Sequence, residues 1–299
     1  MARNETTAPV TKIEPEASVP GLPNQARGYL DEVLKFADER EQAVVSVILF
    51  GSARKGGFSQ GVSDVDLIVV LADEVSRKMK RRLKGDLAAL ELKHKLRERP
   101  KSRIEIIRMW VDKIAGQFKS QFICYRRDFL SGNTAAAFGI NPFLESLILS
   151  THIAFASIVT SAKTIWGEDL LRDAHLPVLT KGHLAKNYIG FFMLNAGALL
   201  AFPLIPNATK YSMSAFKWMI HCCHFCSTLK SARLEEEVEF FRGQVEEDAC
   251  LTELLSLRQE YRPSLRFVWN CFRVIRELYI LTVRVSKFPI SVRGRHIES

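Results

Sequence analysis

Residues 44–70 read VVSVILFGSARKGGFSQGVSDVDLIVV, and this stretch decides the fold of the chain. An apolar run rich in β-branched residues occupies positions 44–50 and ends at Gly51. A second apolar run closes the stretch and contains Asp64 and Asp66. Short apolar runs of this kind, bounded by turn residues, are typical of buried strands. The stretch therefore predicts two strands joined by a turn that begins at the glycine.

Two carboxylates mark the second strand. Side chains alternate between the faces of a strand, so Asp64 and Asp66 are expected to project to the same side. Two negative charges on one face are costly unless something compensates for them. Magnesium prefers hard oxygen ligands and commonly binds through one or two carboxylates together with substrate phosphates. The pair therefore predicts a site for two magnesium ions, which can assist both the attacking and the leaving oxygen of a phosphoryl displacement.

The turn between the strands has the features of a phosphate-binding loop. Gly51 allows a tight turn and close approach of the backbone. Ser52 can cap the helical turn that follows, whose free N–H groups would face an anion. Arg54 and Lys55 add positive charge nearby. These four residues, with Ser63 just before the acidic pair, are the candidate nucleotide-binding residues.

The same residues resemble the signature of the DNA polymerase β-like nucleotidyltransferase superfamily. That signature is an apolar residue, Gly-Ser, about ten variable residues and Asp-x-Asp in an apolar strand, here Gly51, Ser52, Asp64 and Asp66. The local sequence LFGSARKG followed by SDVDLIVV is similar to that of the small bacterial and archaeal branch of the superfamily. This branch includes aminoglycoside nucleotidyltransferases and minimal nucleotidyltransferases.

The resemblance implies an α+β fold, with a polymerase β-like palm of mixed sheet and helices followed by an all-α helical bundle. It also implies two magnesium ions and a nucleoside triphosphate, expected to be ATP. The reaction would transfer a nucleoside monophosphate to a hydroxyl acceptor and release pyrophosphate. A small molecule is the expected acceptor, with an aminoglycoside-like antibiotic as the model. Transfer to a protein or RNA partner, and a non-catalytic nucleotide-binding relative, remain alternatives.

The family usually has a third carboxylate on a neighbouring strand. Residues 102–110 read SRIEIIRMW, and Glu105 is the candidate third metal ligand in this segment. The alternative is an exposed glutamate paired with Arg103 or Arg108. Asp112 is the fallback ligand. Together with Asp64 and Asp66, Glu105 completes the expected catalytic set.

The acceptor hydroxyl must also lose its proton. In aminoglycoside-modifying relatives, a carboxylate from the helical domain takes that role. Glu145, Glu168 and Asp169 are the candidates here, but no motif distinguishes one of them. The general base is therefore left unassigned.

Residue patterns outside the signature predict the organisation of the chain. Residues 1–24 are proline-rich without apolar periodicity, which predicts a disordered tail. A nucleotidyltransferase domain is expected over residues 25–142 and a helical-bundle domain over 143–299. Helical spacing of apolar residues predicts a helix over 31–40 and a second one that starts at Asp73 or Ser76 and ends at about residue 99. Five further helices are predicted over 143 to about 166, 183 to about 202, 211 to about 236, 246–261 and 263 to about 285.

Positive charge is concentrated in one segment. Residues 77–103 hold 12 Lys or Arg and 3 Asp or Glu, and the resulting +9 equals the net charge of the whole chain. Such a segment can be an RNA-binding face or a solvated helix exterior. Aromatic residues are not interleaved along it, so an RNA partner is left open but not favoured.

Two further segments bear on whether the chain spans a membrane or binds a structural metal. The apolar run 188–202 is shorter than the roughly 20 residues of a membrane span, which favours a buried helix and no membrane association. The segment HCCHFC at 221–226 lacks a second pair of ligands, so core cysteines are favoured over a metal site. Six cysteines without disulfide spacing, and no visible secretory signal, predict a cytoplasmic protein. A homodimer remains open.

Overall fold

The computed structural model describes residues 22–55, 65–96, 120–141, 145, 150–203, 205 and 207–292. The chain forms two compact units. The first contains residues 1–99, 120–131 and 162–174, and the second contains 100–119, 132–161 and 175–299. The chain therefore passes between the two units more than once.

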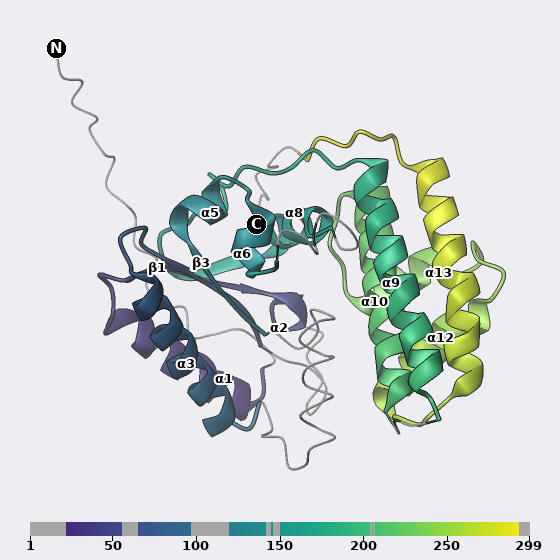
Figure 1. Ribbon diagram of the computed structural model, residues 1–299, viewed down its shortest axis with the longest axis horizontal. Helices are drawn as coiled ribbons and strands as arrows, with labels where there is room; N and C mark the ends of the chain where they lie inside the picture. Colours follow the sequence, from purple (N-terminus) through teal and green to yellow (C-terminus); the bar gives the residue numbers. More distant parts are fainter. Residues whose placement is uncertain are drawn as a thin grey trace. The chain divides into compact units, whose positions relative to one another are not determined.

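The first unit contains a four-stranded mixed sheet in the order β3-β2-β1-β4 (Figure 1). Strand β1 (Val44–Phe50) pairs antiparallel with both β2 (Asp66–Leu71) and β4 (Lys163–Gly167). Strand β3 (Gln121–Tyr125) pairs parallel with β2. The mixed sheet confirms the predicted palm.

One face of this sheet packs against two helices. Helices α1 (Asn24–Asp38) and α3 (Arg77–Lys93) share a hydrophobic core with the strands. Val65, Leu67 and Val69 belong to that core, whereas Asp66 between them does not. These apolar residues therefore face away from Asp66. The helix predicted to start at Asp73 or Ser76 begins after Ser76, whose hydroxyl accepts from the Met79 N–H at 3.2 Å.

The predicted helix from 143 to about 166 is wrong at its C-terminal end. Helix α8 spans His152–Ser161, and residues Lys163–Gly167 form strand β4 instead. The β-branched and aromatic residues of β4 pair with the edge of β1, a contact across more than 100 residues that local spacing does not reveal. Gly167 turns the chain after the strand with φ +81°, where an added Cβ would meet the Val45 carbonyl oxygen.

The second unit is helical, as predicted for the C-terminal part of the chain (Figure 1). Helices α9, α10 and α13 pack against one another and share a core with α11 and α12. Helix α9 contains residues 188–201 of the apolar run. No helix among the described residues is both long and apolar enough to cross a membrane. The helix bounds are α6 (Thr134–Phe138), α9 (Lys181–Ala201), α10 (Ala208–Thr228), α11 (Leu234–Phe241), α12 (Asp248–Gln259) and α13 (Leu265–Val285).

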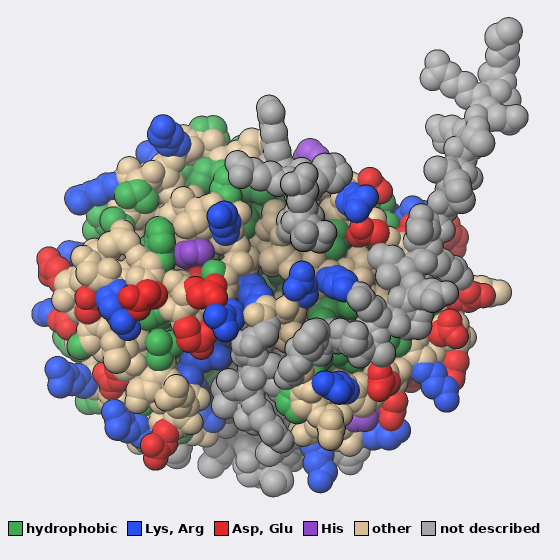
Figure 2. Space-filling model, turned by 180° about the vertical axis from the view of Figure 1, so that it is seen from behind, with side chains coloured by type: hydrophobic (Ala, Val, Ile, Leu, Met, Phe, Trp, Pro, Cys, Tyr) green, Lys and Arg blue, Asp and Glu red, His purple; other side chains and the backbone are tan. Residues whose placement is uncertain are grey.

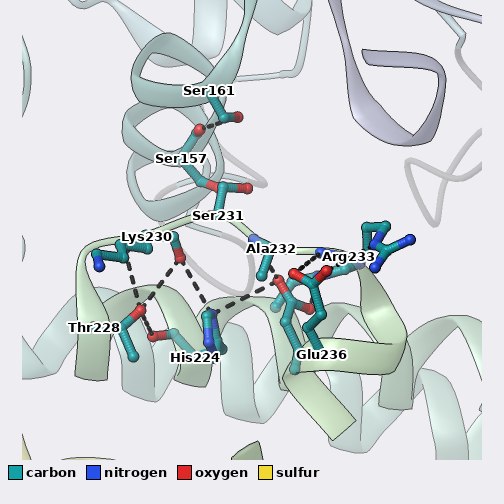
Figure 3. A network of polar contacts seen from close by, with 11 residues as sticks. Ser157, Ser161, His224, Thr228, Lys230, Ser231, Ala232, Arg233 and Glu236 are labelled. Carbon is teal, nitrogen blue, oxygen red and sulfur yellow. Dashed lines mark hydrogen bonds and ion pairs between the residues drawn. The ribbon is translucent and has the colours of Figure 1, made fainter. Parts of the chain in front are cut away.

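The single helix predicted over 211–236 is two helices. Helix α10 ends at Thr228, and Leu229 adopts a left-handed conformation with φ 55°. The Thr228 hydroxyl donates to the His224 carbonyl oxygen at 2.9 Å and accepts from the Lys230 N–H at 3.1 Å (Figure 3). Because no glycine marks this C-terminus, the sequence alone gave no stop signal.

Candidate functional site

The ends of β1 and β2 bring together two residues of the predicted site. In the antiparallel ladder, Phe50 lies opposite Asp66, and Gly51 follows Phe50 directly. Gly51 has φ +71°, and a Cβ at this position would collide with the Asp66 carboxylate. Both the backbone conformation and the close approach therefore require glycine at position 51.

A short helix, α2 (Gly51–Lys55), carries the other candidate residues of the turn. Ala53 is buried in the core of the sheet and anchors this turn. Ser52 and Lys55 are half-buried, and Arg54 is exposed. The turn thus places a hydroxyl and two cations within a few residues of the Gly51–Asp66 contact.

Three predicted site residues lie outside the described part of the chain. They are Ser63, Asp64 and Glu105, and the fallback ligand Asp112 lies outside it as well. Asp66 is half-buried at the start of β2, directly after the buried Val65. Of the predicted metal ligands, Asp66 is the one that the structure places beside the glycine turn.

Two candidates for the general base are held by neighbours in the first unit. Glu168 pairs with the Arg126 guanidinium at 2.8 Å. Asp169 accepts from the Thr164 hydroxyl at 3.0 Å and lies 3.5 Å from Arg172 Nε. These bonds fix the loop that follows β4, which gives both carboxylates a structural role.

The third candidate, Glu145, belongs to a polar cluster of the second unit. Its carboxylate accepts from the hydroxyls of Thr134, at 2.7 Å, and Thr151. His152 Nδ1 lies 3.8 Å from the same carboxylate, and the His152 ring stacks on His183 with the centroids 4.2 Å apart. Burial lowers the pKa of both histidines, and that of His183 falls to about 4. Sequence reasoning missed this histidine pair because no local motif joins positions 31 residues apart.

The cysteine-rich segment of α10 is packed into the core of the helical unit. Cys222, Cys223 and Cys226 are buried, and burial raises the pKa of Cys222 to about 12. All three belong to the hydrophobic core of the helical unit. No group of three or more His, Cys, Asp or Glu within the described ranges could hold a metal ion.

Comparisons with known proteins agree with this geometry. A family model described as a nucleotidyltransferase domain matches residues 30–129. The fold is similar to that of spectinomycin adenyltransferase AAD(9) from Enterococcus faecialis, solved with ATP and spectinomycin, with a TM-score of 0.53 and 10% sequence identity. This likeness covers 84% of this chain and 98% of that one. No curated protein matches the chain. The family model therefore covers about a third of the chain, and the solved structure shows a similar fold.

Proposed function

We propose that the protein is a magnesium-dependent nucleotidyltransferase that moves a nucleoside monophosphate from ATP to a hydroxyl group of a small molecule. The observation that carries this proposal is the contact between the Gly51 backbone and the Asp66 carboxylate. It joins a glycine turn able to approach phosphates and a carboxylate able to bind a metal. The nucleotidyltransferase family model over residues 30–129 supports the reaction class.

The residues at the site fit magnesium. The Asp66 carboxylate is a hard oxygen donor, half-buried at the end of a strand. Asp64 and Glu105 would complete the ligand set, as the signature predicts. Bound magnesium would supply positive charge to the α-phosphate and to the pyrophosphate leaving group.

The chain's own residues would position the triphosphate. Gly51 lets the backbone approach the phosphates, and the hydroxyls of Ser52 and Ser63 would donate hydrogen bonds to them. Arg54 and Lys55 would neutralise part of the charge. Catalysis would then come mainly from positioning and from charge stabilisation. We assign no general base.

A small-molecule acceptor is supported by the fold likeness to AAD(9), which was crystallised with ATP and spectinomycin. The net charge of +9 argues against a strongly cationic acceptor unless acidic groups gather where it binds. A protein or RNA acceptor and a non-catalytic binding role remain alternatives. All six cysteines are free and buried, which is consistent with our proposal of a reducing, cytoplasmic location.

Thermal unfolding in the presence of ATP, CTP, GTP or UTP tests this proposal, each with and without magnesium. We expect one triphosphate, with ATP favoured, to raise the unfolding temperature only when magnesium is present. Stabilisation by no triphosphate would refute nucleotidyl transfer. If a triphosphate binds, acceptors can be screened with a nucleotide labelled on the α-phosphate, and label released only as free nucleoside monophosphate would contradict transfer.

A further inference from the structure

Helix α3 begins with a dense run of cations. Residues 77–84 read RKMKRRLK, so six of eight residues are basic. The apolar side of the helix faces the sheet, since Leu83 and Leu87 are 2% and 0% exposed. Five of the cations point away from that core and are exposed. We call them the α3 basic ridge: Arg77, Lys78, Arg81, Arg82 and Lys84.

Within the residues that the structure describes, no ion pair compensates for this charge. The first turn of α3 contains no acidic residue. No ridge side chain has an ion pair or a hydrogen bond to any residue in the part of the chain that the structure describes. At the other end of the same helix, Lys93 pairs with Glu32 at 2.7 Å. Cations near a helix N-terminus oppose the helix dipole, and like charges four residues apart repel. These charges therefore disfavour the helix, and no ion pair among the described residues offsets that cost.

Solubility alone does not require such a cluster. The face of the molecule in Figure 2 carries Lys and Arg side chains interspersed with Asp and Glu. Mixed charge of this kind is sufficient to keep a protein soluble. A single-sign ridge creates instead a local field that attracts anions.

One further exposed cation lies near α3, in the first turn of α5 (Arg126–Leu130). Lys80 Nζ lies 4.4 Å from the centroid of the Tyr125 ring, and the Arg127 guanidinium carbon lies 5.4 Å from the same centroid. The exposed Arg127 is thereby placed beside the helix that carries the ridge.

We propose that the α3 basic ridge binds the phosphate backbone of a double-stranded nucleic acid. The ridge spans seven residue steps of helix, about 10 Å. A duplex carries one negative charge per roughly 1.7 Å of its axis, so several phosphates lie within that length. Since α3 contains no aromatic residue to stack on bases, contact with the backbone alone is expected, without sequence preference.

A membrane surface fits the ridge less well. Helices that bind at bilayer surfaces insert an apolar face between the lipids. The apolar face of α3 is already packed against the sheet. Within residues 77–84, Met79 is the one large apolar side chain that is exposed, at 42%. The α3 basic ridge has no free apolar face that could enter a bilayer, and its charge suits the phosphate backbone of a nucleic acid.

The ridge is independent of the proposed nucleotide site. Helix α3 covers the sheet face that contains Leu67 and Val69, whereas Asp66 lies on the opposite face of the same strand. A duplex on the ridge would leave the Gly51–Asp66 contact accessible. Binding at the ridge is therefore separable from nucleotidyl transfer.

Fluorescence anisotropy with labelled duplexes of about 20 base pairs, one RNA and one DNA, tests the proposal on the full chain over a series of salt concentrations. Five phosphate contacts predict a slope of about −4 to −5 for log affinity against log salt. The variant R77A/R81A/K84A should reduce the size of that slope by about 2 to 3 and weaken binding at moderate salt at least about tenfold. Alanine favours helices, so α3 should persist, which circular dichroism verifies.

The matched control is R266A/R276A/R284A, which removes three exposed charges from α13 in the other unit. It should leave binding to both duplexes unchanged. The ridge proposal is overturned if the two triple variants weaken binding equally, or if neither duplex binds at low salt. Binding to vesicles of anionic lipid without duplex binding would also overturn it. Because both variants should keep the thermal response to triphosphate, failure here is distinguishable from failure of the proposed enzyme function.

Discussion

The Asp66 carboxylate occupies the space beside Gly51 in which any other residue would place its Cβ. This relationship explains why the turn after β1 must contain glycine. It also couples two parts of the proposed site, since the glycine turn proposed to bind phosphate and the carboxylate proposed to bind metal are in contact.

We expect Gly51→Ala to lose the response to triphosphate. The methyl group would collide with Asp66, and φ +71° strains any residue with a Cβ. The free energy of unfolding should fall by about 1 to 3 kcal/mol, measured by urea denaturation. Gly85→Ala is the matched control, because an added Cβ there meets nothing within 4 Å in the middle of α3. That change should stabilise the protein by about 0.5 to 1 kcal/mol, and equal destabilisation by both variants would contradict our explanation.

Asp66→Asn should abolish transfer of label from the nucleotide while keeping the fold. The amide preserves the size of the side chain but removes the charge that holds magnesium. We expect at least about a hundredfold loss of rate, since metal charge stabilisation contributes several kcal/mol. Asp31→Asn, on the exposed side of α1, should transfer label at the parent rate. An Asp66→Asn variant with full activity would exclude this carboxylate as a metal ligand.

The stacked histidines should make stability depend on pH. Burial lowers the pKa of His183 to about 4, with His152 as the second cause. An unfolded histidine titrates near 6.5, so between those values the unfolded chain binds protons that the folded chain does not. Stability should be full above about pH 6.5 and should be lost as the pH falls toward about 4.

Urea denaturation at neutral and mildly acidic pH measures this loss. His152→Gln should flatten the dependence, because it removes one titrating ring and one cause of the shift in the other. His175→Gln, on an exposed loop residue, should keep the parent pH dependence. Identical profiles for both variants would mean that other groups are responsible.

The buried Glu237 is expected to be a main stabiliser of the turn between α10 and α11. It is 1% exposed, contacts His221 Nδ1, and accepts from the Ala232 N–H at 3.4 Å. Glu237→Ala would leave these groups without their partner, at a cost of about 3 to 5 kcal/mol in the free energy of unfolding. Glu235→Ala, exposed on the same helix, should cost less than about 0.5 kcal/mol. Similar losses for both would show that the burial of Glu237 is unimportant.

The residues that sequence reasoning predicted well are those whose signals are local. The alternation of Val65, Asp66 and Leu67 fixes which face of β2 is buried. Ser76 caps α3 through a bond to a residue three positions later. Both patterns lie within a few residues, so they can be recognised from the sequence without knowledge of the fold.

The features that escaped prediction depend on distant contacts. Strand β4 exists because Lys163–Gly167 meet an open edge of β1, and the residues themselves also suit a helix. The end of α10 rests on a non-glycine residue, Leu229, held in a left-handed conformation by its surroundings. The pairing of His152 with His183 likewise arises only when α8 and α9 pack together.

The chain returns to the sheet of the first unit to form β4, and this order has a consequence for synthesis and for truncation. Strand β1 gains its second neighbour only when residues 163–167 have emerged from the ribosome. A fragment that stops at residue 142 would keep β1 as an unprotected edge, with free N–H and C=O groups able to recruit strands from other chains. A fragment that contains the whole first unit must therefore extend through residue 174, where its last segment ends.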